Sequence, residues 1–172
     1  MLRTRLDKAY LKRTIRPLYG WTQATPTHCF LDPAWDRSFN IWPGMGMKKT
    51  LGDNVTLVDA TGSPYGLAAL YVGGDGIDEI LDQGVNAFAV WRLEPDAEFE
   101  IDAPAFDSTQ TWTDPGDGTH TLVHVNTGAA ADTKRGKLTP AGTTHASTSP
   151  IARLIKVNSA TTITIGGLQG TV

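Results

Sequence analysis

The sequence has a single cysteine and no long apolar run, and a third of it is almost without positive charge. Cys29 is the only cysteine, so a disulfide within the chain and a zinc site built from several cysteines are both excluded. No stretch approaches the roughly 18 apolar residues that a membrane-spanning helix needs. The apolar residues near the N terminus are spread among basic ones, unlike the continuous apolar core of a secretory signal. We therefore expect a soluble protein that is not secreted by the usual route, with no membrane partner.

Charge is strongly segregated along the chain. Fourteen of the 18 acidic residues lie between Asp53 and Asp117, where Arg92 is the only base. The first sixteen residues instead carry six bases and one acid, Asp7. These bases are Arg3, Arg5, Lys8, Lys12, Arg13 and Arg16. Segregation of this kind favours docking to a charged surface or to further copies of the chain over chemistry on a small substrate.

A basic arm has two interpretations, a nucleic-acid grip or an extended contact with a protein. Tyr10 and Tyr19 lie among the bases, which suits phosphate and base contacts. The acidic middle of the chain would be repelled by DNA, however, so the composition favours a protein partner and no direct nucleic-acid contact.

Residues 1–40 are expected to lie outside regular structure. Leu2, Leu6 and Ala9 have helical spacing, but Pro17 interrupts the pattern and the apolar face is thin, so an arm that orders on contact fits better. An aromatic-rich segment follows at Gly20–Pro43, and we expect it to be a structured loop that packs on a core or on a neighbouring subunit. Its large aromatic residues are Trp21, Phe30, Trp35, Phe39 and Trp42.

The rest of the chain predicts a mainly β protein. It has 18 glycines and 10 prolines among short runs rich in Val, Ile and Thr, which is typical of short strands and many turns. The strands are predicted at 45–48, 54–58, 66–71, 86–92, 97–102, 111–112, 119–125, 136–139, 151–158 and 161–165. The strands at 111–112 and 119–125 are expected to form a hairpin across the turn at Asp114–Gly118. One short helix is predicted at Ile77–Leu81, ended by Gly84.

Several constellations suggest chemistry, and each has a plainer interpretation. His120 and His124 share a strand face near Asp114 and Asp117, but the spacing supplies no dense ligand cluster, so two solvent-facing histidines are favoured over a metal site. The turn at Asp114–Gly118 lacks the register of an EF-hand calcium loop and predicts a tight turn.

The remaining candidates also favour structural roles. Glu98, Glu100 and Asp102 alternate along one strand and predict a solvated acidic face, since an acid catalyst would need one carboxyl to be desolvated. Gly73–Gly76 lacks the Lys of a phosphate loop and predicts a flexible turn. Cys29, beside His28, is interpreted as a structural cysteine and not as a nucleophile. We expect no enzymatic activity, no metal and no cofactor.

Several segments carry a resemblance to a known family. They are Ile41–Lys49, Gly52–Leu57, Asp59–Gly62, Gly66–Ala68, Gly84–Asn86, Ala89–Trp91, Pro95–Phe99, Gly136–Pro140 and Ala152–Leu154. Together they resemble the head decoration proteins of tailed bacteriophages, and the later segments are similar to members from phages of actinobacteria. The resemblance implies a small β-barrel behind an opening strand pair.

The resemblance also implies a function and an organisation. It implies a homotrimer on the outer surface of the virion capsid, made in the host cytoplasm, that binds the major capsid protein and cements neighbouring capsomers. We expect an extended basic, aromatic-rich arm at 1–40, a β-barrel-like domain at 41–107 and a second β-rich portion at 108–172. The arm, including its six bases with Trp21 and Trp35, is the predicted capsid-binding element.

Two alternatives remain open at this level. The chain could be another virion structural protein of the tail or baseplate, which use similar small β domains. It could also be a carbohydrate-binding surface domain, with Trp91, Trp112 and the acidic strand as the sugar site.

Overall fold

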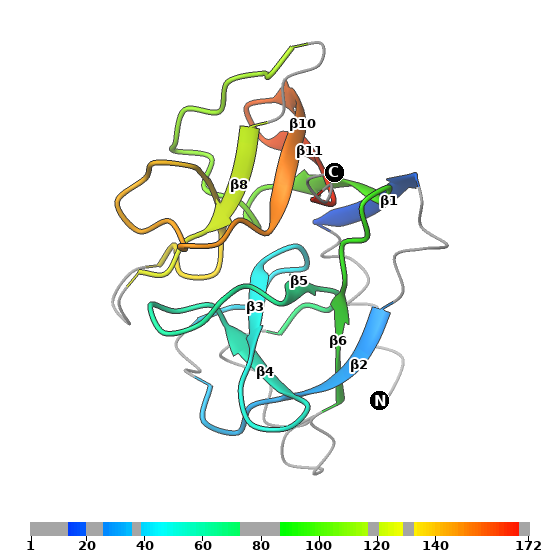
Figure 1. Cartoon of the computed structure of the whole chain (residues 1–172), viewed down its shortest axis with the longest axis vertical. Helices are drawn as coiled ribbons and strands as arrows, with labels where there is room; N and C mark the ends of the chain where they lie inside the picture. Colours follow the sequence, from blue (N-terminus) through cyan, green and yellow to red (C-terminus); the bar gives the residue numbers. More distant parts are fainter. Residues whose placement is uncertain are drawn as a thin grey trace, which may run out of the picture.

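The fold is built from β-strands in two sheets. The computed structural model describes residues 14–19, 26–35, 39–72, 87–116, 121–128 and 133–168. These residues contain eleven strands and no helix, so nothing in the described part forms a helix long and apolar enough to cross a bilayer. Figure 1 shows a barrel in one half of the molecule and the second sheet in the other.

The first sheet is a closed five-stranded barrel. Its strands are β2 (Pro26–Leu31), β3 (Gly46–Lys49), β4 (Asn54–Leu57), β5 (Gly66–Ala68) and β6 (Ala87–Trp91). The order around the barrel is β2-β4-β3-β5-β6, and the β2–β6 pair closes it. Alternation of side chains along a strand places Cys29 and Leu31 of β2 inside, while Phe30 points outward.

The second sheet has six strands. They are β1 (Ile15–Tyr19), β7 (Glu98–Asp102), β8 (Thr121–Val125), β9 (Leu138–Pro140), β10 (Ala152–Ser159) and β11 (Thr162–Gly166). The order is β1-β7-β11-β10-β8-β9, with antiparallel neighbours throughout. β1 is an edge strand with Pro17 in it and a shift of register between Pro17 and Tyr19. Proline and a bulge are features that keep an edge strand from pairing with another chain.

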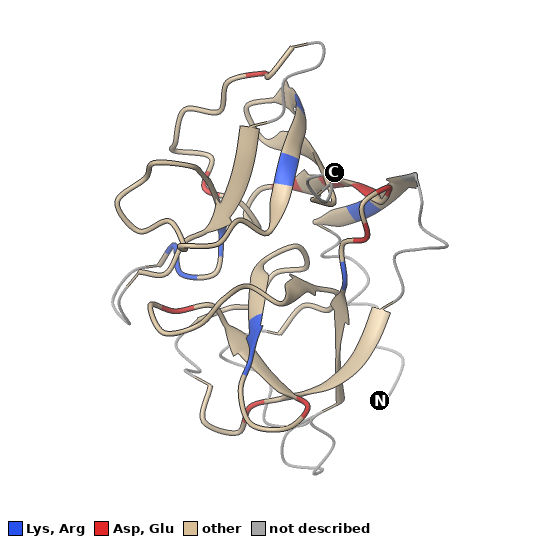
Figure 2. Cartoon of the chain, viewed as in Figure 1, with Lys and Arg blue, Asp and Glu red and all other residues tan. Residues whose placement is uncertain are grey.

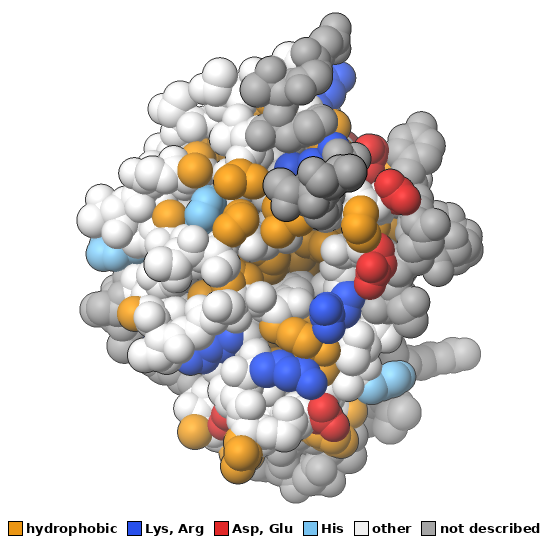
Figure 3. Space-filling view, in the orientation of Figure 1, with side chains coloured by type: hydrophobic (Ala, Val, Ile, Leu, Met, Phe, Trp, Pro, Cys, Tyr) orange, Lys and Arg blue, Asp and Glu red, His pale blue; other side chains and the backbone are white. Residues whose placement is uncertain are grey.

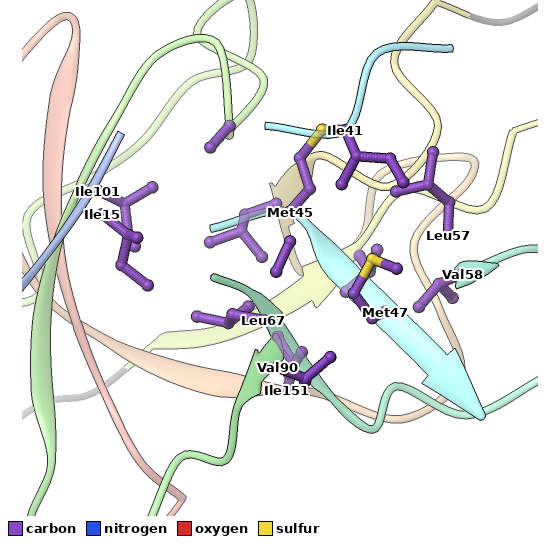
Figure 4. Close-up of a cluster of buried hydrophobic side chains, with 14 of the residues drawn as sticks. Ile15, Ile41, Met45, Met47, Leu57, Val58, Leu67, Val90, Ile101 and Ile151 are labelled. Atoms are coloured by element: carbon purple, nitrogen blue, oxygen red, sulfur yellow. The ribbon is translucent and has the colours of Figure 1, made fainter. Parts of the chain in front are cut away.

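One continuous hydrophobic core joins the two sheets. In Figure 4, Ile15 and Ile101 of the six-stranded sheet lie on one side, Met47 of the barrel lies on the other, and Met45 is between them. Close approach of the backbones makes this possible, since a Cβ on Gly46 would lie 2.3 Å from Cγ2 of Val125. Glycine at position 46 therefore lets β3 of the barrel pack directly on β8.

The prediction of a mainly β protein with a barrel and a second β-rich part is confirmed. The strand predicted at 111–112 is wrong, because these residues have no strand pairing and β8 pairs with β9 and β10 instead. Trp112 packs its ring edge-on against Phe106, at 5.5 Å between centroids, so the segment is held by side-chain packing. The predicted helix at Ile77–Leu81 lies outside the described residues, and no helix is seen within them.

The N-terminal segment is more structured than the sequence indicates. Within residues 1–40, β1 pairs with β7 and β2 forms part of the barrel wall. The strand β7, within 41–107, belongs to the same sheet as the strands of 108–172. The two sheets therefore do not follow the segment boundaries expected from the sequence, because strands distant in the chain complete each sheet.

Candidate functional site

The acidic strand β7 is bound to the basic residue of β1. Arg16 donates from Nε and Nη2 to Oε1 of Glu100, at 2.9 and 2.5 Å, and from Nη1 to Oδ2 of Asp102, at 2.7 Å. Asn158 donates to the other oxygen of Glu100 at 3.1 Å, and Thr162 donates to Asp102 at 2.8 Å. The hydrogen bonds that Arg16 donates, first to Glu100 and then to Asp102, raise the pKa of Arg16.

The acids of β7 lie on the outer face of the strand, as expected, and Arg16 of β1 lies across two of them. The side chains of Glu100 and Asp102 keep 26% and 25% of their exposure, and both contact the single guanidinium of Arg16, which balances one of their two negative charges. Figure 2 shows basic and acidic segments side by side where β1 meets β7. Arg16 is therefore engaged in a contact within the chain.

A second charged cluster ties the barrel to the turn before β9. Lys48 donates to Oδ1 of Asp59 at 2.5 Å, and Arg135 contacts Oδ2 of Asp59 at 3.2 Å. The backbone and hydroxyl of Thr61 also donate to Asp59, at 2.8 and 2.7 Å. Burial by itself raises the pKa of Asp59, but the hydrogen bonds from Lys48 and Thr61 outweigh it and lower the pKa to about 2. This cluster is structural, since Lys48 is 9% exposed.

A third charged group lies deep in the second half of the chain. Asp107 is 2% exposed and forms a 3.0 Å ion pair with Lys134. Burial raises the pKa of Asp107, while hydrogen bonds from Thr109 and Lys134 more than compensate and lower it. Trp112 donates from Nε1 to the carbonyl oxygen of Asp107 at 2.9 Å. The Asp107 carboxylate and the Trp112 indole N–H therefore both make contacts within the chain.

Basic, aromatic and exposed apolar side chains lie together at the end of the barrel where the turn joins β3 to β4. Lys49 Nζ lies 5.0 Å from the centre of the Tyr65 ring, and the guanidinium carbon of Arg92 lies 4.5 Å from the same centre. Lys49 also forms a 3.3 Å pair with Asp53, whose side chain is 70% exposed. Leu51, in the turn between Lys49 and Asp53, is 88% exposed. Figure 3 shows basic side chains beside apolar surface on the barrel half of the molecule.

Comparison with known families decides the class of the protein. A family model of phage cement proteins matches residues 1–170. The chain belongs to the phage cement protein family. No curated protein and no solved structure matches it. Membership makes this a structural protein with a capsid cement role in the virion, and the resemblance to phage head decoration proteins is confirmed.

The predicted binding arm of this cement protein is only partly within the described residues. Arg3, Arg5, Lys8, Lys12, Arg13 and Trp21 lie outside them. Arg16 contacts Glu100 and Asp102, as above. Trp35 is 5% exposed and belongs to the hydrophobic core, as does Phe39, which agrees with the expectation that the aromatic-rich segment packs on a core. Trp35 and Arg16 thus face partners inside the chain.

The residues weighed for a metal site and for a sugar site occupy separate places in the described part of the chain. No group of three or more His, Cys, Asp or Glu side chains there is placed to hold a metal ion. His120 lies outside the described residues, and His124 donates from Nδ1 to the carbonyl oxygen of Ser147 at 2.6 Å. Trp91 and Trp112, the residues of the sugar-site alternative, pack against Phe99 and Phe106.

Two smaller predictions concern residues 29 and 114. Cys29 is 2% exposed, and burial raises the pKa of its thiol, so it is a structural core residue. Asp114 accepts hydrogen bonds from the backbone N–H of Gly116 at 3.0 Å and of Val157 at 3.2 Å. These bonds, the Gly116 one first, lower the pKa of Asp114. The carboxylate therefore links the segment at 114–116 to β10, and the rest of the predicted turn lies outside the described residues.

The sequence reasoning missed the basic and aromatic surface of Lys49, Tyr65 and Arg92. One signal was available, because Arg92 is the only base between Asp53 and Asp117. A second was the apolar Leu51 in a turn before Gly52, where polar residues are usual. Tyr65 carried no signal, since its place beside both cations follows from the barrel closure.

Proposed function

We propose that this protein decorates the outside of a phage head as a homotrimer and stabilises the junctions between capsomers by binding the major capsid protein. Family membership over residues 1–170 is the observation that carries the proposal. The described residues add support, because Asp59, Glu100, Asp102 and Asp107 each contact a base within the fold.

Attachment at several points explains how such a protein would act. A trimer that contacts the capsid at three places dissociates slowly even when each contact is weak. The basic segment before β1 would supply one set of contacts by extending over acidic capsid surface. Similarity to decoration proteins from phages of actinobacteria favours heads of that group as the binding target.

A deletion that tests the basic arm must leave β1 in place. Removing residues 1–19 would delete β1, and with it the Arg16 contacts to Glu100 and Asp102. The backbone carbonyl of Thr14 also accepts a hydrogen bond from the Asp102 N–H, at 2.8 Å. A truncation that leaves the sheet intact should therefore stop at residue 13.

The experiment is co-sedimentation of the purified protein with undecorated heads of its own phage over a salt series. We compare the full chain, a deletion of residues 1–13, and a full-length variant with Gln in place of Arg3, Arg5, Lys8, Lys12 and Arg13. Saturable binding by the full chain, weaker and less dependent on salt in both variants, supports the proposal. Absence of binding by the full chain refutes it, and immunogold labelling of virions then shows whether the protein lies on tails.

Equal binding by the full chain and both variants would retain the cement role and remove the arm from it. Sedimentation equilibrium of the free and the head-bound protein tests the trimer separately. A monomer on the head surface would contradict the trimeric part of the proposal.

A further inference from the structure

We propose that the surface formed by Lys49, Leu51, Tyr65 and Arg92 docks an acidic segment of the major capsid protein, with the two cations holding carboxylates and Leu51 filling an apolar depression. We call it the barrel-end surface. The inference rests on the proposed function and adds where on the barrel the capsid binds.

The two cations of the barrel-end surface are poorly compensated. Both lie within 5.0 Å of the centre of one aromatic ring. Within the described residues Arg92 forms no ion pair, and Lys49 has only the exposed Asp53, at 3.3 Å. By contrast, Arg16, Lys48, Lys134 and Arg135 each contact an acid of the chain. Two like charges that share a ring leave a positive potential that an incoming carboxylate relieves.

The shape of the surface is fixed before binding. The turn that carries Leu51 is closed by hydrogen bonds between Thr50 and Asn54, at 2.9 Å, and between Asn54 and Leu51, at 3.3 Å. Thr50 Oγ1 donates to Asp32 at 2.6 Å, and the N–H of Phe30 donates to the carbonyl of Asp53 at 3.0 Å. Phe30 is itself 52% exposed. A rigid apolar tip loses little conformational entropy on docking, which favours its use as an anchor.

The positive charge of the barrel-end surface indicates an acidic occupant. Asp59 and Asp107 are paired with bases of the chain, and Glu100 and Asp102 share Arg16. Glu94 and Asp96 are exposed, so docking to a second copy is an outcome that the test has to separate. The capsid protein is the partner that the proposed function already requires. A segment with two or more acids beside an apolar residue is complementary to the surface in both charge and hydrophobicity.

The test measures binding of charge-reversal variants to undecorated heads. The variant Lys49→Glu/Arg92→Glu is compared with Lys137→Glu/Lys156→Glu, which makes the same change in net charge just before β9 and in β10. We expect about tenfold weaker binding for the first pair and less than about twofold for the control, in line with the loss of interfacial charge pairs. Urea midpoints within error of the wild type show that all variants fold.

A second variant pair tests the apolar anchor. Leu51→Ser should weaken head binding by about fivefold, as for loss of a buried leucine contact, whereas Leu122→Ser, at a side chain 45% exposed on β8, should leave it unchanged. Leu51 is 88% exposed, so its replacement leaves the fold intact.

The outcomes separate the two proposals. Wild-type binding that the Lys49→Glu/Arg92→Glu change leaves unaltered would overturn the barrel-end surface and keep the cement function. No binding by the wild type would overturn both. Charge reversal that dissociates an oligomer of the free protein, without changing the affinity of the protomer for heads, would assign the surface to a second copy and overturn the capsid assignment.

Discussion

Replacing Asp59 by Asn tests how the barrel is joined to the turn before β9. Asp59 binds Lys48 and Arg135, which come from the barrel and from that turn. Its pKa is lowered from 3.8 to about 2, and its side chain is 26% exposed. A decrease of that size corresponds to about 2 kcal/mol of stability, since one pKa unit is about 1.4 kcal/mol.

The sign of the pH dependence follows from the direction of the shift. Because the folded-state pKa of Asp59 is below the unfolded value, its contribution is complete above about pH 4 and is lost as the pH falls toward 2. The wild type should lose about 2 kcal/mol from this group over that range. Asp59→Asn should be destabilised by about 2 kcal/mol at pH 7 and should lack this part of the acid dependence.

The assay is urea unfolding at pH 7, 4 and 2.5, with the free energy of unfolding taken by linear extrapolation. Asp53→Asn is the matched control, because Asp53 is 70% exposed and forms only a long pair with Lys49. The control should track the wild type at every pH. If Asp59→Asn and the wild type lost equal free energy on acidification, the reasoning about the Asp59 cluster would be refuted.

Two further predictions concern the contact between β1 and β7 and the packing of β3 on β8. Arg16→Ala should lower the free energy of unfolding by about 1 kcal/mol, near the upper end for exposed ion pairs, because the contact is multidentate. Amide hydrogen exchange should become faster in β1 and β7 but not in the barrel. An equal increase in exchange over the whole protein would contradict this role. Gly46→Ala should cost about 1–3 kcal/mol, because the new methyl group lies 2.3 Å from Val125. Adding Val125→Ala to Gly46→Ala should recover part of that loss in thermal unfolding, and strictly additive losses would count against the clash.

Much of the fold followed from local patterns. The strand β7 was predictable because Phe99 and Ile101 alternate with acids, and burial of the apolar pair is what the structure shows. The β1 strand was not, because Pro17 and the surrounding bases resemble a solvated arm. Its strand conformation depends on β7, whose acids compensate Arg16 and whose backbone pairs with it.

The candidate site was also predictable only in part from the sequence. Arg92 and Leu51 were unusual for their positions in the sequence, but their neighbours were not. Lys49 and Tyr65 are sixteen residues apart and Arg92 is farther still along the chain. They meet because β3, β5 and β6 are adjacent in the closed barrel. Contacts across a barrel are set by strand order and register, which local spacing does not encode.

By itself, the sequence determined the class of this protein: mainly β, segregated in charge, without the residues for a disulfide framework, and a member of the phage cement family. Those properties depend on composition and local alternation. Only the tertiary structure decided which charges remain available to a partner. Arg16 and Trp35 look like docking residues along the chain, yet one is paired with β7 and the other is buried. The physical reason is that charge compensation and burial are pairwise and act through space.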